Sequence, residues 1–115
     1  MKRKPGRPKG SPIRQNIIEI LYFMGEGYGY EIHKIYNELF DPVTQESIYY
    51  NLKRGVNNNE FILKEIKIEK GEFSWGQTAE KYIYVLGPQA NARILNEIKE
   101  FFDTRRDKES LVHKS

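Results

Sequence analysis

The chain has 115 residues, with 19 Lys and Arg against 16 Asp and Glu and a formal net charge of +3. This length suits one domain with a modest core, and the absence of cysteine excludes disulfides, thiolate catalysis and Cys-ligated zinc. No apolar stretch is long enough to span a bilayer, and no signal-peptide cleavage site follows the basic start. We therefore expect a cytoplasmic protein with no membrane partner.

Positive charge is concentrated at the start of the chain. Residues 2–9 read Lys-Arg-Lys-Pro-Gly-Arg-Pro-Lys, which places five cationic side chains within ten residues. Without those five charges, the net charge of +3 becomes −2 for residues 11–115. The sequence therefore predicts a disordered basic arm, residues 1–11, attached to a slightly acidic body, and such an arm is typical of proteins that bind nucleic acid.

The arm has features that suit the minor groove of DNA. Two prolines keep it extended, and Gly6 allows a close approach of the backbone. An extended strip with Arg7 at its centre fits the narrow, negative minor groove of A·T-rich DNA. Residues 4–11 resemble the AT-hook, a Gly-Arg-Pro core between basic residues; a generic basic tail that touches phosphates is the alternative. The predicted contacts are Arg3, Lys4, Gly6, Arg7, Pro8 and Lys9.

The body shows two hydrophobic periods, one helical and one of period two. Helical spacing, with a Ser-Pro start and a Thr44 cap, predicts helices over 12–24, 28–40 and 44–56. Period-two spacing predicts strands over 61–69 and 81–86, and Gly87-Pro88 opens a last helix. The predicted fold class is mainly α with a small β-hairpin (α+β). The order of the elements is that of a winged helix-turn-helix domain, which we place over 12–104. We expect a frayed tail over 105–115. A generic small α+β domain is the alternative.

Three stretches of the body are similar to one family of proteins. They are Gly-Tyr-Gly-Tyr-Glu-Ile at 27–32, Ser-Ile-Tyr-Tyr-Asn-Leu-Lys-Arg at 47–54 and Tyr-Val-Leu-Gly-Pro at 84–88. They resemble the PadR-like branch of winged-helix transcriptional regulators, over roughly residues 12–102. The resemblance implies a DNA-binding transcription regulator that forms a homodimer through its last helix.

Some positions depart from the family's pattern. Tyr50 stands where the family usually has Pro, and Gly55 stands where it has an aliphatic residue. The wing sequence at 69–76 is also unlike the general pattern, which leaves open a distinct, archaeal group. Phenolic-acid sensing is therefore not assumed, and the small-molecule effector is unknown.

A helical wheel of the third helix separates two faces. Ile48, Tyr49, Leu52 and Val56 are expected to face the core, opposite a polar face centred on Ser47, Tyr50 and Arg54. Arg grips guanine and Asn grips adenine in the major groove, while Ser and Tyr reach phosphates or bases. A plain solvated face is the alternative. The predicted DNA contacts of the body are Thr44, Gln45, Ser47, Tyr50, Asn51, Lys53 and Arg54, with Lys70 in the wing.

The last helix carries a wide apolar stripe. Its members are Ile94, Ile98, Phe101 and Phe102. They either pack on the first helix or form a twofold dimer interface, and the dimer would favour a pseudo-palindromic DNA site.

Enzyme activity is not expected. The two histidines, His33 and His113, lie far apart, and the sequence has no metal-ligand spacing, no Ser-His-Asp set and no phosphate loop after a strand. We expect no cofactor and no metal, and His33 is expected at the surface or rim.

Three functions fit these observations. The first is a transcriptional regulator, associated with the nucleoid, that binds double-stranded DNA with 44–56 in the major groove and the arm in the minor groove. The second is an architectural chromatin-associated protein with little sequence preference. The third is a winged-helix module that joins a protein complex through Trp75 and the last helix. The near-neutral body favours the regulator, because a coating protein is usually basic throughout.

Overall fold

A computed structural model describes the backbone of residues 12–70 and 78–114 and the side chains of 12–68 and 80–105. The predicted basic arm, the wing residues around Trp75 and the side chain of Lys70 lie outside the described residues. The predictions for them stay predictions.

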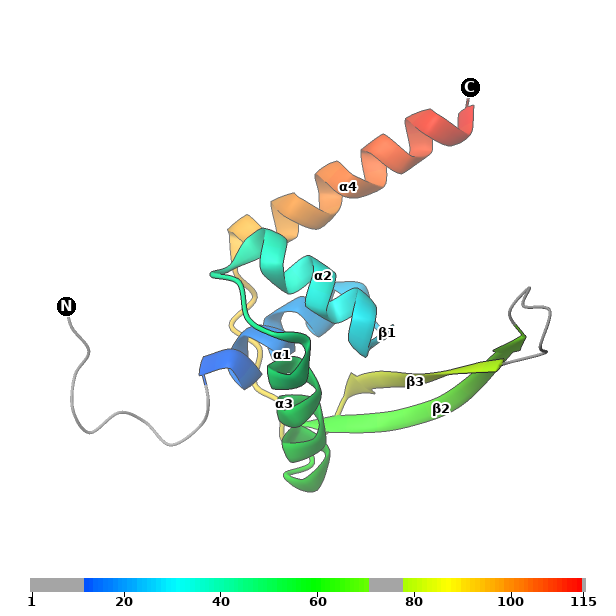
Figure 1. The fold of residues 1–115 in the computed structure, drawn as a ribbon. Helices are drawn as coiled ribbons and strands as arrows, with labels where there is room; N and C mark the ends of the chain where they lie inside the picture. The colour runs from blue at the N-terminus through cyan, green and yellow to red at the C-terminus, as the bar shows by residue number, and fades with distance from the viewer. Residues whose placement is uncertain (1–11, 71–77, 115) are drawn as a thin grey trace.

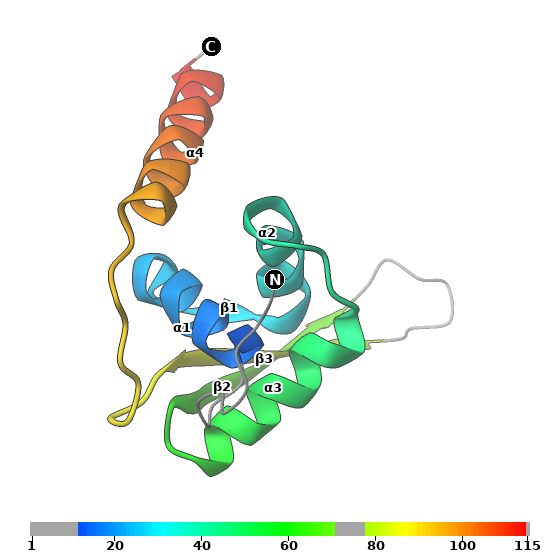
Figure 2. The same ribbon diagram turned by 90° about the vertical axis from the view of Figure 1, so that its left-hand side faces the viewer.

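The described chain forms four helices and a small three-stranded antiparallel sheet (Figure 1). The elements are α1 (Pro12–Met24), β1 (Gly27–Tyr28), α2 (Gly29–Leu39), α3 (Gln45–Asn57), β2 (Phe61–Lys70), β3 (Thr78–Leu86) and α4 (Asn96–Lys114). The predicted fold class, an α+β winged helix-turn-helix, is confirmed. In both ribbon views α3 and α4 lie at opposite ends of the body (Figure 2).

The sheet has the strand order β1-β3-β2, and the long β2–β3 hairpin is the wing. Its register runs from the pair Phe61–Leu86 to the pair Lys70–Thr78, with a bulge between Leu63 and Glu65. The short strand β1 was not predicted, because two residues are too few to show a period. It pairs with β3 through Gly27–Tyr84 and Tyr28–Ile83.

The turns follow from local chemistry. Gly25 has a φ of +84° and donates its N–H to Leu21 O at 2.8 Å, which ends α1 in the left-handed conformation that glycine favours. Asn59 has a φ of +62° between α3 and β2, a conformation that Asn tolerates better than most residues.

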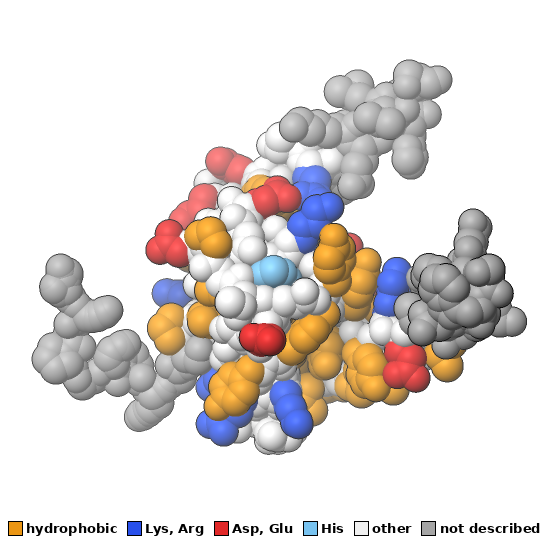
Figure 3. Space-filling view, in the orientation of Figure 1, with side chains coloured by type: hydrophobic (Ala, Val, Ile, Leu, Met, Phe, Trp, Pro, Cys, Tyr) orange, Lys and Arg blue, Asp and Glu red, His pale blue; other side chains and the backbone are white. Residues whose placement is uncertain are grey.

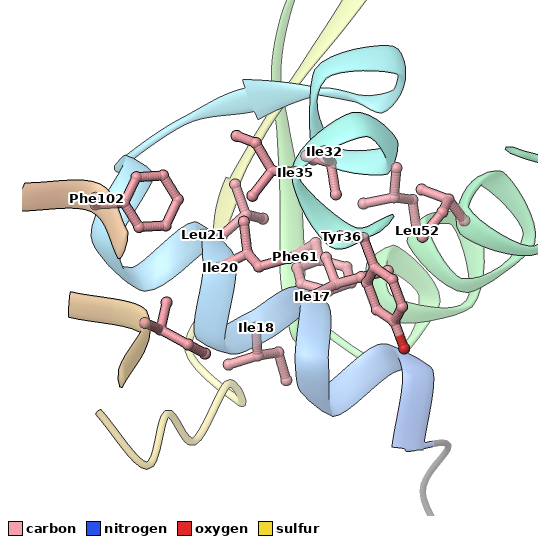
Figure 4. Packing of buried hydrophobic residues seen from close by; sticks show 12 residues of the cluster. Ile17, Ile18, Ile20, Leu21, Ile32, Ile35, Tyr36, Leu52, Phe61 and Phe102 are labelled. Atoms are coloured by element: carbon pink, nitrogen blue, oxygen red, sulfur yellow. The ribbon is translucent and has the colours of Figure 1, made fainter. Parts of the chain in front are cut away.

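The core lies among all four helices and the base of the wing (Figure 4). Its fully buried members include Ile17, Ile20, Ile32, Leu52 and Phe61. It continues through Ile18, Leu21, Ile35, Tyr36, Ile48, Ile98 and Phe102. Burying a side chain of this size contributes about 1.5–3 kcal/mol to stability.

The segment between β3 and α4 corrects one prediction. The last helix was expected to open after Gly87-Pro88, but residues 87–95 are not helical and α4 begins at Asn96. The reason lies in Glu19, which is fully buried on α1. Its carboxylate accepts hydrogen bonds from the backbone N–H of Arg93 at 2.9 Å and of Ile94 at 3.1 Å. These bonds hold residues 93 and 94 against α1 and engage amides that a helical turn through this segment would use; Ile94 itself has a φ of +59°.

Helix α4 corrects two further predictions. Ile98 and Phe102 were predicted at a dimer interface, but their exposed fractions are 1% and 8%, and both belong to the chain's own core. Phe102 stacks on Phe23 of α1, with ring centroids 6.3 Å apart. Of the predicted stripe, Phe101 is half-buried and Ile94 is exposed. The helical backbone continues to Lys114, and fraying of 105–115 stays a prediction.

Candidate nucleic-acid interface

The connection between α2 and α3 is fixed by side chains of α2. Asn37 Oδ1 accepts the backbone N–H of Val43 at 3.0 Å, and Nε2 of His33 lies 2.7 Å from Val43 O. A protonated Nε2 donates to that carbonyl at this distance. Thr44 Oγ1 then accepts the N–H of Ser47 at 3.1 Å and caps α3 as predicted. These contacts fix the direction in which α3 leaves the turn. A helix that enters a DNA groove needs such a fixed direction.

One face of α3 is open to solvent and carries most of the predicted DNA contacts. Thr44, Gln45, Tyr50, Lys53 and Arg54 are exposed, and Ser47 is half-buried. The guanidinium carbon of Arg54 lies 5.9 Å from the centroid of the Tyr50 ring. The exposed residues of this helix therefore include two cations, the carboxylate of Glu46, amide and hydroxyl groups, and the rings of Tyr49 and Tyr50.

Asn51 corrects the wheel. It was predicted to contact adenine, but it is 4% exposed and donates from Nδ2 to Ser47 O at 2.9 Å. The buried residues of α3 are Ile48, Asn51, Leu52 and Gly55, spaced at i, i+3, i+4 and i+7. Asn51 thus faces the body, and its side-chain NH₂ group is hydrogen-bonded within its own helix. It is not part of the open face.

Tyr49 and Gly55 explain why the helix is turned this way. Tyr49 was expected in the core, but it is 46% exposed and its ring packs on the first residue of α2, where a Cβ on Gly29 would lie 1.9 Å from Tyr49 Cε1. A Cβ on Gly55 would lie 2.1 Å from the Phe61 ring. Because Gly55 has no side chain, β2 packs closely on the side of α3 that carries residue 55. The buried face of α3 therefore runs through residues 48, 51, 52 and 55. Glycine at the position usually aliphatic in the resembled family was the sequence signal for this.

The wing adds both charge and apolar surface beside α3. Lys64 and Lys67 are exposed, and Lys64 Nζ lies 2.5 Å from Glu26 Oε1. This hydrogen bond lowers the pKa of Glu26 and raises the pKa of Lys64, so both groups stay charged near neutral pH. Exposed apolar side chains also follow β2 and β3, and Figure 3 shows hydrophobic surface gathered on this side of the molecule. They are Ile62, Leu63, Ile66, Ile68 and Tyr82.

The rest of the described surface offers little for other chemistry. No group of three or more His, Asp or Glu side chains capable of holding a metal occurs within the described part. Of the described helices, none is long and apolar enough to cross a membrane. A hollow of about 230 Å³ lies between α1, α2 and α4, and its lining includes no residue of α3. It is therefore separate from the open face of α3.

Comparisons with solved structures return PadR-type regulators. A PadR family transcription regulator from Clostridium difficile R20291 is 24% identical over 90% of this chain and 93% of that chain, with a TM-score of 0.49. PadR from Bacillus subtilis in complex with operator DNA is 20% identical over 76% of this chain and 46% of that chain, with a TM-score of 0.45. A PadR-like regulator from Bacillus cereus is 24% identical over 90% and 95%, with a TM-score of 0.39. Neither the protein-family models nor the curated proteins give a match.

Proposed function

We propose that this chain is a DNA-binding transcriptional regulator that lays the open face of α3 in the major groove. The observation that carries the proposal is the fixed helix-turn-helix, which presents Tyr50, Lys53 and Arg54 on one exposed face of α3. A helix fits the major groove, and a rigid turn sets its orientation there. Among the described residues no second element covers that face, because the body packs on the opposite side of the helix through Ile48 and Leu52.

The exposed cations divide into two roles. Arg54 has the planar fork that bonds guanine O6 and N7, and we assign it to base reading. Lys53 is a point charge on a flexible stem, suited to phosphate, as is the exposed wing lysine Lys67, whereas Lys64 is already bonded to Glu26. The basic arm adds phosphate or minor-groove contacts on the flank of the site.

Homodimerisation is a further part of the proposal. Because Ile98 and Phe102 are buried within one chain, the interface would use Ile94 and Phe101, together with the surface of α4 that lies opposite α3. Two chains joined at that end would present two α3 helices to one duplex. Such a dimer binds a palindromic site, and half-site spacing follows its geometry.

Selection of bound sequences from random duplex DNA tests the function. We expect a short motif containing a guanine, and Arg54→Ala should lose preference for that guanine while the protein stays folded. Lys53→Ala is the matched control and should weaken binding to all sequences alike. Enrichment of A·T content alone would favour an architectural protein.

The exposed apolar residues of the wing favour a second candidate, a protein-interaction module. Ile66 and Tyr82 are cross-strand partners, and both are exposed. Contiguous exposed apolar surface is a mark of protein–protein interaction sites. Absence of any enrichment in the selection would make this candidate the better one.

A further inference from the structure

Tyr50 is the most exposed aromatic side chain among the described residues, with an exposed fraction of 60%. It stands on the open face of α3, one helical turn before Arg54, and the two side chains are in contact range at 5.9 Å from guanidinium carbon to ring centroid. An aromatic ring held in water gains free energy when a partner covers it. This ring therefore has more to gain from a complex than any other described aromatic.

The contact with Arg54 constrains where the ring can go. A guanidinium bonds guanine through its edge, which leaves its flat face free to lie against an aromatic ring. When Arg54 bonds guanine O6 and N7, a ring that stays beside the guanidinium lies over the neighbouring base pair, because successive base pairs are about 3.4 Å apart. The one apolar group that a base presents in the major groove is the 5-methyl of thymine.

We propose that Tyr50 and Arg54 read a guanine and an adjacent thymine as one unit, with the Tyr50 ring packed on the thymine 5-methyl. This inference rests on the proposed function and adds the identity of a second base to it. It also gives a role to a residue at which the chain departs from the resembled family, where Pro is usual. The cation–π contact of the two side chains favours the arrangement in which they lie side by side.

The competing role for Tyr50 is a hydrogen bond from its hydroxyl to a phosphate. The two roles use different atoms of the side chain, so they separate cleanly. Tyr50→Phe keeps the ring and removes the hydroxyl, whereas Tyr50→Ala removes both. A phosphate contact is lost in both variants, and a methyl contact is lost only in Tyr50→Ala.

The experiment replaces thymine by uracil in the selected site, which removes only the 5-methyl and keeps the base pair. We expect the wild-type chain to lose about fourfold in affinity, since burying one such carbon contributes about 0.8 kcal/mol. Tyr50→Phe should show the same uracil effect, and Tyr50→Ala should show none. Tyr30→Ala, which removes an exposed tyrosine of α2, is the matched control and should keep the effect.

The outcomes separate this inference from the function on which it rests. A motif with an Arg54-dependent guanine but no neighbouring thymine, or an equal uracil effect in wild type and Tyr50→Ala, overturns the thymine contact and leaves the regulator in place. Uniform loss of affinity in Tyr50→Phe, with no uracil effect in the wild-type chain, assigns the residue to phosphate and also overturns the thymine contact. A selection with no motif overturns the function and the inference together.

Discussion

The buried carboxylate of Glu19 is a sharp test of how the body is held together. It accepts the backbone N–H groups of Arg93 and Ile94, and Gln15 Nε2 lies 2.6 Å from its second oxygen. Removal of this carboxylate leaves the N–H groups of Arg93 and Ile94 without that acceptor, at about 1–3 kcal/mol each, and empties a fully buried site on α1. We therefore expect Glu19→Ala to lower the free energy of unfolding by about 3–5 kcal/mol, a large part of the roughly 5–15 kcal/mol typical of such domains.

A conservative variant refines the magnitude. In Glu19→Gln, the remaining side-chain oxygen still accepts a backbone N–H of the segment before α4. The new NH₂ group replaces an oxygen that accepts hydrogen bonds, so it faces donors such as Gln15 Nε2 or the N–H of Arg93. Hydrogen bonds to charged groups contribute about 1.5–3 kcal/mol each, so we expect a loss of about 2–3 kcal/mol. Urea unfolding followed by circular dichroism measures both values. Glu65→Gln, an exposed carboxylate on β2, is the matched control and should change stability by less than about 0.5 kcal/mol. A loss below about 1 kcal/mol for Glu19→Ala would refute the view that this carboxylate anchors the segment before α4.

Four other perturbations have expected results. Arg54→Ala should relax the choice of one base, at about 1–3 kcal/mol, as measured by competition binding with altered sites. Asn51→Ala should leave the affinity of the folded fraction unchanged while lowering stability by about 1–3 kcal/mol, because a buried residue loses its bond to Ser47 O; a shifted motif would contradict this. Gly55→Val should lower stability by at least about 1–3 kcal/mol, since its Cβ meets the Phe61 ring at 2.1 Å; an unchanged urea midpoint would contradict it. Deleting residues 1–10 should reduce the log–log salt slope of binding by roughly 4, at about 0.9 per phosphate contact; an unchanged slope would show that the arm does not touch DNA.

Local signals predicted most elements of this fold. The Thr44 cap, the Gly25 stop and the change from helical to period-two spacing each act within a few residues, and each was recovered in the structure. The start of α4 was missed because Glu19 lies more than 70 residues away from the amides that it binds. A contact between residues so far apart leaves no signal in the sequence around α4. The one indication was Glu19 itself, a single acid within the apolar run of the first helix.

The helical wheel of α3 was wrong at two positions, and the DNA contacts predicted from it stay predictions. A wheel averages over a whole helix, so it placed the bulky Tyr49 inside and the polar Asn51 outside. The structure reverses both, because Gly29 and Gly55 let neighbouring elements approach α3 closely on particular sides. Close packing against a glycine depends on the tertiary arrangement. A helical wheel considers only the hydrophobicity of side chains, so it does not predict such packing.

The distribution of charge suggests different roles for the arm and the body in the proposed function. Helix α3 carries one acid, Glu46, and two bases, Lys53 and Arg54, and residues 11–115 have a net charge of −2 once the five arm charges are subtracted from +3. Affinity for a polyanion grows with the number of phosphates neutralised, so a body of this charge binds weakly by itself. In the proposed function, the arm would supply the salt-dependent affinity and α3 would supply the choice of bases. The arm deletion should therefore change how tightly all sequences bind and leave the order of preference set by Arg54 intact. A deletion that instead reordered the preferred sequences around that guanine would place part of the base reading in the arm.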